Sequence, residues 1–364
     1  MLATDGAAPR ADSHPAPDLD SLEPALVLRI HRLMARSRAL DELLIRMAHS
    51  GEGAFWIGGP GEEAFQIPLG LQVRRGQGPA FDYLILHYRN LPTLVALGLD
   101  PADALRQMAM RATDPFSRGR NFVAHFCRRD WNLLPIASAV GLRHTIAPGT
   151  ALVQKRHGGE GITIVTGGDA STSLGDFASC LVWSTRPGQE LPVLVVVQNN
   201  GVGISTPYSE VHAEGSIVER GRAFGIPGEV VDGNDPVASW HAVRRAMAWC
   251  RRQRRPYLLD ARVARLHGHS STSGAARDPR QPDCLALWED RLARAGLLDP
   301  EAAAALRAAA RAEAEAALVL VRGEPEPRPG DVSALTYAPS PVDALYPDDY
   351  TGLPHADLAS GPPR

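Results

Sequence analysis

Lysine is almost absent from this sequence: among 364 residues the only one is Lys155. Enzymes that form a Schiff base with a carbonyl substrate or with pyridoxal phosphate need a lysine nucleophile. The neighbours of Lys155, which are Gln154, Arg156 and His157, indicate an exposed helix end. The sequence therefore disfavours pyridoxal-phosphate enzymes and Schiff-base aldolases.

Cysteine is also scarce. The four cysteines are widely spaced and form no Cys-x-x-Cys pair. Zinc clusters and dithiol redox sites need closely spaced pairs, so neither kind of site is indicated. We interpret these residues as reduced thiols in or near the core: Cys127, Cys180, Cys250 and Cys284.

The chain lacks long apolar runs and a strong charge of either sign. No apolar run approaches the length of a membrane span. Residues 1–20 are rich in Ala, Pro and Asp and lack the basic and then apolar pattern of a secretory signal. A net charge of −3 argues against broad affinity for nucleic acid or anionic membranes. We therefore expect a cytoplasmic protein that binds neither.

Apolar periodicity predicts a helix-rich N-terminal part followed by alternating strands and helices. Residues 22–49 carry apolar side chains at helical spacing and predict one long helix. The later alternation predicts an α/β fold, a doubly wound parallel sheet with a helical N-terminal extension. Further helices are expected at 101–110, at 136–156 with a break at Pro148-Gly149, at 174–185, at 237–251 and, on the surface, at 301–320; strands are expected at 162–166, 192–197, 229–231 and 257–263.

Composition divides the chain into three parts. Residues 1–20 are expected to be a disordered N-terminus, and residues 21–322 one large domain. Residues 323–364 begin as a proline-rich linker and continue as a C-terminal tail. This tail carries apolar and aromatic anchors that are expected to dock on a partner subunit: Tyr337, Leu345, Tyr346 and Tyr350.

Polar residues follow two of the predicted strands. Gly168, Asp169 and Ala170 come after the first of these strands, and Asn199 and Asn200 come after the next. The segment between them has room for a crossover helix, which makes the two strands parallel and adjacent. One carboxylate, one amide oxygen and a loop carbonyl are hard ligands that suit magnesium with phosphate oxygens. Each half alone is an ordinary turn sequence; together they predict a site for a divalent metal and a diphosphate.

These segments resemble a known family. The stretches 168–177 and 198–207 resemble the thiamine-diphosphate motif of the alpha subunit of 2-oxo acid dehydrogenases, in their decarboxylating component. Five further segments are similar to that family in the right order, so the resemblance covers about residues 25 to 320: 61–64, 87–89, 231–235, 255–259 and 265–273. It implies the thiamine-diphosphate-binding fold.

The resemblance also implies roles for single residues. Asp169, the side chain of Asn200 and the carbonyl of Val202 would hold Mg²⁺, which bridges the phosphates of thiamine diphosphate. Tyr88 and Arg89 would reach the same diphosphate. The catalytic residue would be His269, over the cofactor, whereas His267 would serve the packing of its own loop. The full set implied to bind the cofactor is Tyr88, Arg89, Gly168, Asp169, Ala170, Ser171, Asn200, Val202, Gly203, Ile204 and His269.

The implied reaction is the oxidative decarboxylation of a 2-oxo acid with acyl transfer to a lipoyl group. The implied partners are a lipoyl-bearing acyltransferase and a beta subunit, in an alpha2-beta2 heterotetramer. The beta subunit supplies the carboxylate that activates the cofactor, so this chain alone should be inactive. The residue types at positions 55–57 and in the motifs favour a branched-chain substrate over pyruvate or acetoin.

Three departures from the family pattern keep a second hypothesis open. The segment 125–138 is shorter than its family counterpart, Val202 stands where many relatives have tyrosine, and Ser273 is followed by Gly-Ala-Ala in place of acidic residues. A non-catalytic scaffold or regulatory subunit that keeps the fold is therefore the alternative to a catalytic alpha subunit.

Overall fold

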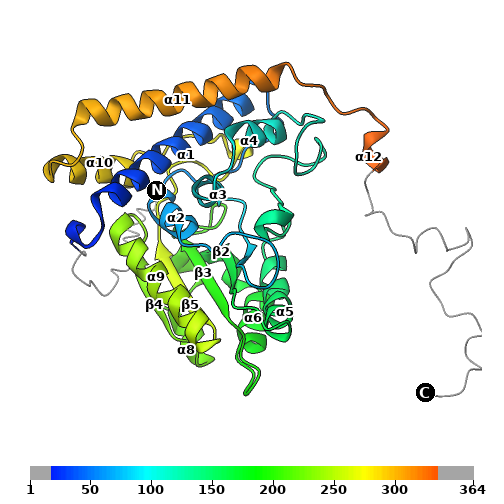
Figure 1. Ribbon diagram of the computed structural model, residues 1–364, viewed down its shortest axis with the longest axis vertical. Helices are drawn as coiled ribbons and strands as arrows, with labels where there is room; N and C mark the ends of the chain where they lie inside the picture. Colours follow the sequence, from blue (N-terminus) through cyan, green and yellow to red (C-terminus); the bar gives the residue numbers. More distant parts are fainter. Residues whose placement is uncertain (1–17, 335–364) are drawn as a thin grey trace, which may run out of the picture. The chain divides into compact units, whose positions relative to one another are not determined.

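The computed structural model describes residues 18–334 (Figure 1). The chain divides into two units, Met1–Glu326 and Pro327–Arg364. In the second unit, the described residues include one short helix, α12 (Asp331–Ala334). The four predicted tail anchors, Tyr337, Leu345, Tyr346 and Tyr350, lie outside the described residues. The predicted domain boundaries stay a prediction. The last residues of the predicted disordered N-terminus, however, belong to a 3₁₀ turn, η1 (Leu19–Ser21), and Leu19 is buried.

A five-stranded, fully parallel sheet lies at the centre of the first unit, with strand order β1-β2-β3-β5-β4. This confirms the predicted parallel sheet. β2 and β3 run in register from Thr163 opposite Val193 to Gly168 opposite Gln198, so both strands end at the same edge. We call this edge the carboxyl edge. The strands are β1 (Tyr83–Ile85), β2 (Thr163–Gly168), β3 (Val193–Asn199), β4 (Gly228–Asp232) and β5 (Tyr257–Arg262).

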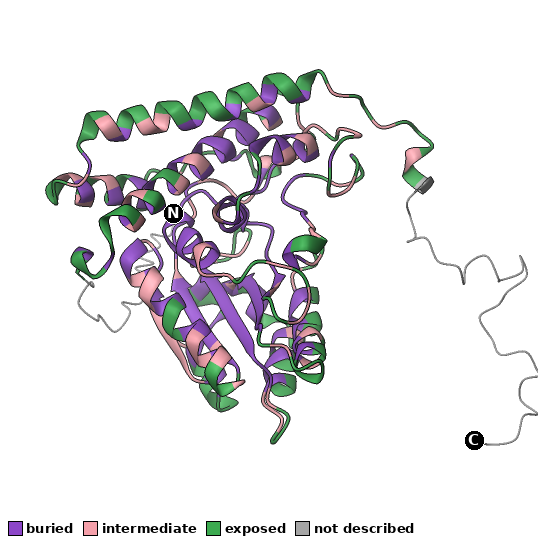
Figure 2. Cartoon of the chain, viewed as in Figure 1, coloured by how far each residue is buried: buried purple, intermediate pink, exposed green. Residues whose placement is uncertain are grey.

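Helices cover both faces of the sheet, which confirms the doubly wound arrangement (Figure 1). Alternate side chains of a strand point to opposite faces. Val195 of β3 accordingly packs in a core with α5, α6 and α8, while Val196 packs with α9. The central strands β2, β3 and β5 are almost entirely buried on both faces, as is usual in parallel sheets, whereas the edge strand β4 is partly exposed (Figure 2). The helices are α5 (Leu142–Arg156), α6 (Gly175–Ser184), α7 (Tyr208–Val211), α8 (Val218–Ala223) and α9 (Pro236–Gln253).

The N-terminal helical extension forms a further layer with the last long helices. The predicted helix 22–49 is α1 (Pro24–Ser50), which begins with a proline and ends at Gly51, whose φ of 80° favours glycine. α1 packs along α11 (Pro300–Arg322), the predicted surface helix. The remaining helices are α2 (Glu63–Leu71), α3 (Leu91–Leu97), α4 (Pro101–Met108) and α10 (Cys284–Arg294). None of the helices within residues 18–334 is long and apolar enough to cross a membrane.

The predicted helix at 136–156 was wrong in two respects. α5 begins only at Leu142, and Pro148 lies inside it without a break. A proline inside a helix costs about 3 kcal/mol. Ala147 and Ala151 on either side of it are fully buried against the sheet, and such packing supplies most of the stability of a helix in a protein. Tertiary packing therefore outweighs the local preference of the proline.

Candidate functional site

Two predicted metal ligands lie at neighbouring strand ends on the carboxyl edge. Asp169 follows β2 directly as the first residue of a 3₁₀ turn, η3 (Asp169–Ser173). Asn200 directly follows β3. Ligands of open parallel sheets bind beyond this edge. The structure brings the two residues together, since the backbone N–H of Asn200 donates to the carboxyl group of Asp169, and their role as metal ligands stays a prediction.

The carboxyl group of Asp169 is buried, with 2% of the residue exposed. Burial raises its pKa; hydrogen bonds from its own backbone N–H and from that of Asn200, and the charge on His212, act in the opposite direction. Asp169 has no ion-pair partner within residues 18–334. Because a bound cation favours the charged carboxylate, a metal ion at this position would offset the cost of burial.

The loop after β3 is held against η3. The side-chain oxygen of Asn200 accepts the N–H of Val202 at 3.3 Å. A Cβ placed on Gly203 would lie 3.4 Å from the Cβ of Ala170, so the two backbones pass close together. Arg265 donates from Nη1 to the carbonyl of Gly203 at 2.6 Å. The predicted cofactor-binding residues of the two strand ends therefore form one continuous surface.

Two predicted cofactor-binding residues on this surface differ in their surroundings. The hydroxyl of Ser171 donates to the carbonyl of Gly168 at 2.6 Å, so it fixes the turn at the end of β2. The side chain of Ile204 is largely free of protein contacts, since 68% of the residue is exposed. An apolar side chain this exposed gains stability only when a ligand or a second chain covers it.

Tyr88 and Arg89 lie beside His269; their contact with a cofactor stays a prediction. The ring of Tyr88 meets that of His269 edge-on, with centroids 6.3 Å apart. Arg89 donates from Nη1 to the carbonyl of Gly58 at 2.5 Å, and from Nη2 to the carbonyl of His269 at 3.0 Å. Both Nη atoms of the guanidinium predicted to reach the diphosphate are therefore bonded to protein groups, and Nη2 holds His269 in place.

The contact with Arg89 also defines the protonation of His269. Its Nδ1 lies 3.1 Å from Nη2 of Arg89. Because a guanidinium only donates, Nδ1 accepts and the proton of the neutral ring resides on Nε2. Burial, together with the charges of Arg89 and Arg265, lowers the pKa of His269 to about 4. At neutral pH the residue is an uncharged imidazole with an Nε2–H available to a ligand.

Glu62 is a residue of this site that the sequence did not single out. It is 1% exposed, and its Oε2 accepts from Nε2 of Gln198 at 2.8 Å and of Gln66 at 2.9 Å. Its Oε1 has no partner. Burial raises its pKa to about 7 despite the opposing charge of Arg89. The adjacent Glu63, by contrast, forms an ion pair with Arg38, so the two glutamates of one motif have different functions.

Arginines and carboxyl groups lie close enough at this edge to influence one another. Arg89, Arg143 and Arg265 supply three guanidinium groups, and Glu62 and Asp169 supply two carboxyl groups. The pKa of Glu62 lies near 7, so cationic charge exceeds anionic charge at neutral pH. A diphosphate bound with a divalent cation offers anionic oxygens to the arginines and a positive charge to the carboxylates, so such a site can hold both.

The side chains of residues 18–332 offer no cluster of three His, Cys, Asp or Glu suited to a metal. An ion at Asp169 would therefore take its other ligands from the amide of Asn200, a backbone carbonyl and the ligand itself. Magnesium is bound in this way, through one or two carboxylates and phosphate oxygens. The donor set fits magnesium thiamine diphosphate.

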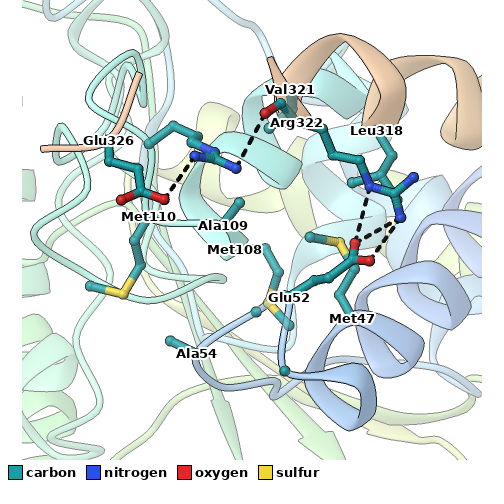
Figure 3. Close-up of a pocket in the computed structure, with 13 residues that line it drawn as sticks. Met47, Glu52, Ala54, Met108, Ala109, Met110, Leu318, Val321, Arg322 and Glu326 are labelled. Atoms are coloured by element: carbon teal, nitrogen blue, oxygen red, sulfur yellow. Dashed lines mark hydrogen bonds and ion pairs between the residues drawn. The ribbon is translucent and has the colours of Figure 1, made fainter. Parts of the chain in front are cut away.

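A cavity of about 410 Å³ lies apart from this edge, between the ends of α1, α4 and α11. Figure 3 shows Glu52 and Arg322 at one side, Glu326 at the other and Met108 between them. Glu52 pairs with Arg322, and Glu326 with Arg111. Its lining includes none of the carboxyl-edge residues described above, and its two acidic groups already pair with arginines.

The comparisons with known proteins agree with this geometry. A model of the dehydrogenase E1 component family matches residues 31–330. The chain belongs to this family. It is 29% identical over 280 residues to a 2-oxoisovalerate dehydrogenase subunit alpha of Bacillus subtilis, which covers 75% of this chain and 83% of the relative.

Two other relatives are a plant mitochondrial protein and a second bacterial protein. A mitochondrial 2-oxoisovalerate dehydrogenase subunit alpha 1 of Arabidopsis thaliana is 28% identical over 275 residues, 76% of this chain and 56% of the relative. A pyruvate dehydrogenase E1 component subunit alpha of Staphylococcus aureus is 28% identical over 258 residues, which are 71% of this chain and 65% of the relative. This E1 chain thus spans little more than half of its mitochondrial relative. The predicted family, an alpha subunit of the 2-oxo acid dehydrogenase E1 component, is confirmed.

The loop that departs from the family pattern is ordered by another part of the E1 chain. Ser270 to Ser273 form a turn, η4 (Ser271–Ser273), closed by a capping box. The N–H of Ser271 donates to the carbonyl of Trp56 at 2.9 Å, and the N–H of Trp56 donates to the hydroxyl of Ser271 at 3.0 Å. His267 makes a hydrogen bond between its Nδ1 and the carbonyl of Ala275 at 2.9 Å. The protein therefore supplies its own contacts for this loop.

The short segment 125–138 is also structured. It contains a 3₁₀ turn, η2 (Arg129–Trp131), and Leu133 bridges to Leu84 of β1. His125 and Ser138, the two ends of the segment, meet at 2.6 Å between Nε2 and Oγ. The shorter segment therefore closes on itself next to the edge strand.

Proposed function

We propose that this E1 alpha subunit binds magnesium thiamine diphosphate at the carboxyl edge and acts in the oxidative decarboxylation of a 2-oxo acid. The observation that carries the proposal is the pairing of buried Asp169 with Asn200 at adjacent strand ends, inside a group of arginines. When bound, the cofactor supplies the carbanion equivalent that attacks the 2-oxo group and accepts electrons as carbon dioxide leaves.

The protein's own residues bind and orient in this reaction. Asp169, the amide of Asn200 and the carbonyl of Val202 hold the metal ion. Tyr88 faces the diphosphate, and Arg89 positions His269 through its backbone and Nδ1. The Nε2–H of His269 donates to an anionic oxygen of the cofactor or the substrate, since this neutral tautomer keeps its proton near pH 7.

Asp169→Ala tests the metal assignment. The variant should lose magnesium-dependent binding of thiamine diphosphate, because the charged oxygen ligand is removed, while its unfolding temperature should change little. Asp169→Asn, which keeps the volume of the side chain, should lose binding too. Asp290→Ala, on the outer surface of α10, is the control. Calorimetry on the chain with its beta subunit measures the affinities, and unchanged affinity in Asp169→Ala would remove the metal assignment.

A beta subunit is the partner that we propose for this chain. The relatives are named as alpha subunits. α5 and α6, which cover one face of the sheet, also expose apolar side chains that a second chain would cover. We call them, with Leu174 just before α6, the α5–α6 face: Leu142, Ile146, Val153, Leu174, Val182 and Trp183.

For the substrate, we propose a branched-chain 2-oxo acid, with transfer of the acyl group to the lipoyl group of an acyltransferase. Two of the relatives named above act on 2-oxoisovalerate, and one on pyruvate. Trp56, which contributed to the sequence argument, is fully buried and donates to Asp41, so it supports the Ser271 turn and does not line the edge. Decarboxylation by the coexpressed pair with a panel of 2-oxo acids tests this choice. Cofactor binding without turnover on any of them would favour the non-catalytic scaffold.

A further inference from the structure

Arg143, the second residue of α5, is a buried cation without a counter-ion. It is 4% exposed, yet it forms no ion pair with any carboxylate of residues 18–334. Its Nε and Nη2 have no hydrogen-bond partner, and Nη1 reaches only the carbonyl of Val140, at 3.5 Å. Burying an unpaired charge costs several kcal/mol. Such a group therefore requires an explanation.

The first turn of α5 places this guanidinium at the carboxyl edge. The ring of the next residue, His144, lies against Gly167 at the end of β2, since a Cβ on Gly167 would be 3.0 Å from its Cε1. The guanidinium of Arg143 lies 5.9 Å from the centre of the Tyr88 ring, and that of Arg89 lies 5.4 Å from the same centre. Tyr88 thus has two arginines over its ring.

The two arginines differ in how their donors are used. Both Nη atoms of Arg89 are bonded to protein groups, namely Gly58 and His269. Arg143 keeps an Nε–H and its Nη2 donors free. Burial lowers the pKa of Arg143 to about 10, so the side chain remains charged at neutral pH. Burial and the charges of Arg143 and Arg89 lower the pKa of the neighbouring His87, so this side chain is uncharged and does not compensate the charge of Arg143.

We infer that Arg143 is an anion-binding residue of the cofactor cleft, whose free donors hold an anionic oxygen of the diphosphate or of the 2-oxo acid carboxylate. The inference rests on the proposed function for the identity of the anion. A planar guanidinium with two adjacent donors matches either oxygen pair. The sequence motifs did not indicate this residue, because an arginine near a helix start is ordinarily a surface side chain.

The first arm of the test measures binding of inorganic pyrophosphate with Mg²⁺ to the chain coexpressed with its beta subunit, by calorimetry. Arg143→Gln should weaken this affinity by roughly tenfold to a hundredfold, the effect of one charged hydrogen-bonding group. Arg143→Lys should recover part of it. The matched control is Arg186→Gln, because Arg186 also stacks on an aromatic ring, that of Trp183 at 4.2 Å, and has an unpartnered Nε, but lies beyond the end of α6.

The second arm measures KM for the 2-oxo acid with the coexpressed subunits at saturating cofactor. A loss in the pyrophosphate arm assigns Arg143 to the diphosphate. A rise in KM alone assigns it to the substrate carboxylate. Wild-type affinity in both arms overturns the inference while leaving the proposed function intact. Failure of the wild-type chain and of its coexpressed complex to bind pyrophosphate or thiamine diphosphate would overturn the proposed function and this inference together.

A third measurement separates binding from a structural role. Neutralising an unpaired buried charge should stabilise the ligand-free chain, so Arg143→Met should raise its unfolding temperature by at least about 1 °C. The same variant should lose the further rise that pyrophosphate gives the wild type. A lower unfolding temperature in the free chain, with the ligand-induced rise intact, would show that Arg143 serves the fold and would overturn the inference.

Discussion

Two buried arginines of this protein have the same exposure and opposite surroundings. Arg38 of α1 is 5% exposed and Arg143 of α5 is 4% exposed. Arg38 binds Glu63 through two parallel hydrogen bonds, at 2.6 and 3.0 Å, and Asp283 at 3.0 Å. Arg143 has no carboxylate partner within the described residues. Burial alone therefore does not define the role of a charged group; the state of its donors does.

The difference separates a structural region from a binding region. Burial is the largest single influence on the pKa of Arg38 and lowers it, but Glu63, Cys284 and Asp283 together raise the pKa by more, so the net pKa lies well above the usual value. For Arg143, the shift is downward. The helical layer of α1, α2 and α10 thus satisfies the buried charge of Arg38 internally. The carboxyl edge leaves charges unsatisfied, at a cost in stability that binding can recover.

The largest effect is expected in the helical layer. Arg38→Met should destabilise the chain by about 3–5 kcal/mol, because Glu63 and Asp283 lose their compensating charge. Arg36→Met, on the same helix but in a solvent-exposed pair with Glu313, should cost no more than about 1 kcal/mol. Urea unfolding of the two variants measures the difference. Equal losses of stability in the two variants would show that the buried ion pairs of Arg38 contribute no more than the exposed pair of Arg36, and would contradict the comparison.

A pH-dependent effect should follow from Asp41, one turn beyond Arg38. This carboxyl group is buried, accepts one hydrogen bond from Trp56 at 3.0 Å and has an unpartnered second oxygen. Burial raises its pKa from 3.8 to about 7. The folded chain therefore holds this proton where the unfolded chain releases it, so the stability from Asp41 is complete at low pH and is lost as the pH rises to about 7.

Asp41→Asn should remove this dependence. Between pH 5 and pH 8 the wild type should lose on the order of 3 kcal/mol more stability than the variant. Urea unfolding at several pH values gives both curves. Parallel curves for the two proteins would mean that Asp41 is ionised in the folded chain, and that its single hydrogen bond satisfies it as fully as Arg38 is satisfied.

At the carboxyl edge, function should change without stability. His269→Ala should lower turnover of the coexpressed complex by about a hundredfold, near 2.7 kcal/mol, because a positioned donor is lost. His267→Ala is the matched comparison, since His267 bonds to Ala275 of its own loop. It should reduce loop protection from proteolysis more than the chemical step. Full activity in His269→Ala together with loss in His267→Ala would show that the two histidines have been assigned in the wrong order.

The sequence predicted the parts of this fold that depend on local patterns. The parallel strands, the long α1 and the adjacency of Asp169 and Asn200 follow from periodicity and from turns after apolar runs. β1 was missed because three residues, Tyr83–Ile85, are too few to show a period. α2 was missed because a proline, Pro68, lies inside it and nearly all of its side chains are buried, so it has no amphipathic pattern.

The site was only partly predictable for a different reason. Neighbouring residues of one motif, Glu62 and Glu63, have identical chemistry but face different partners. Arg143 likewise differs from the other arginines of the described chain only through its contacts with residues that are distant in the sequence. Long-range packing decides which charges remain free, and a single sequence does not encode that outcome in any local window.

The smallest effect on the chain's own stability is expected at the α5–α6 face. Val153 and Trp183 are 52% and 51% exposed. Replacing both with serine should change the free energy of unfolding by no more than about 0.5 kcal/mol for each residue, because neither is packed in the core.

Association should change strongly, since an exposed apolar face is stabilised by covering it. We expect sedimentation of the wild-type chain to show self-association or a complex with its beta subunit, and the double variant to sediment as a lighter species. Leu320→Ser, at a 58% exposed position of α11, is the control and should assemble as the wild type does. A wild-type chain that is a monomer and binds thiamine diphosphate tightly by itself would contradict the heterotetramer, and would assign the unsatisfied charges of the carboxyl edge to a complete site within one chain.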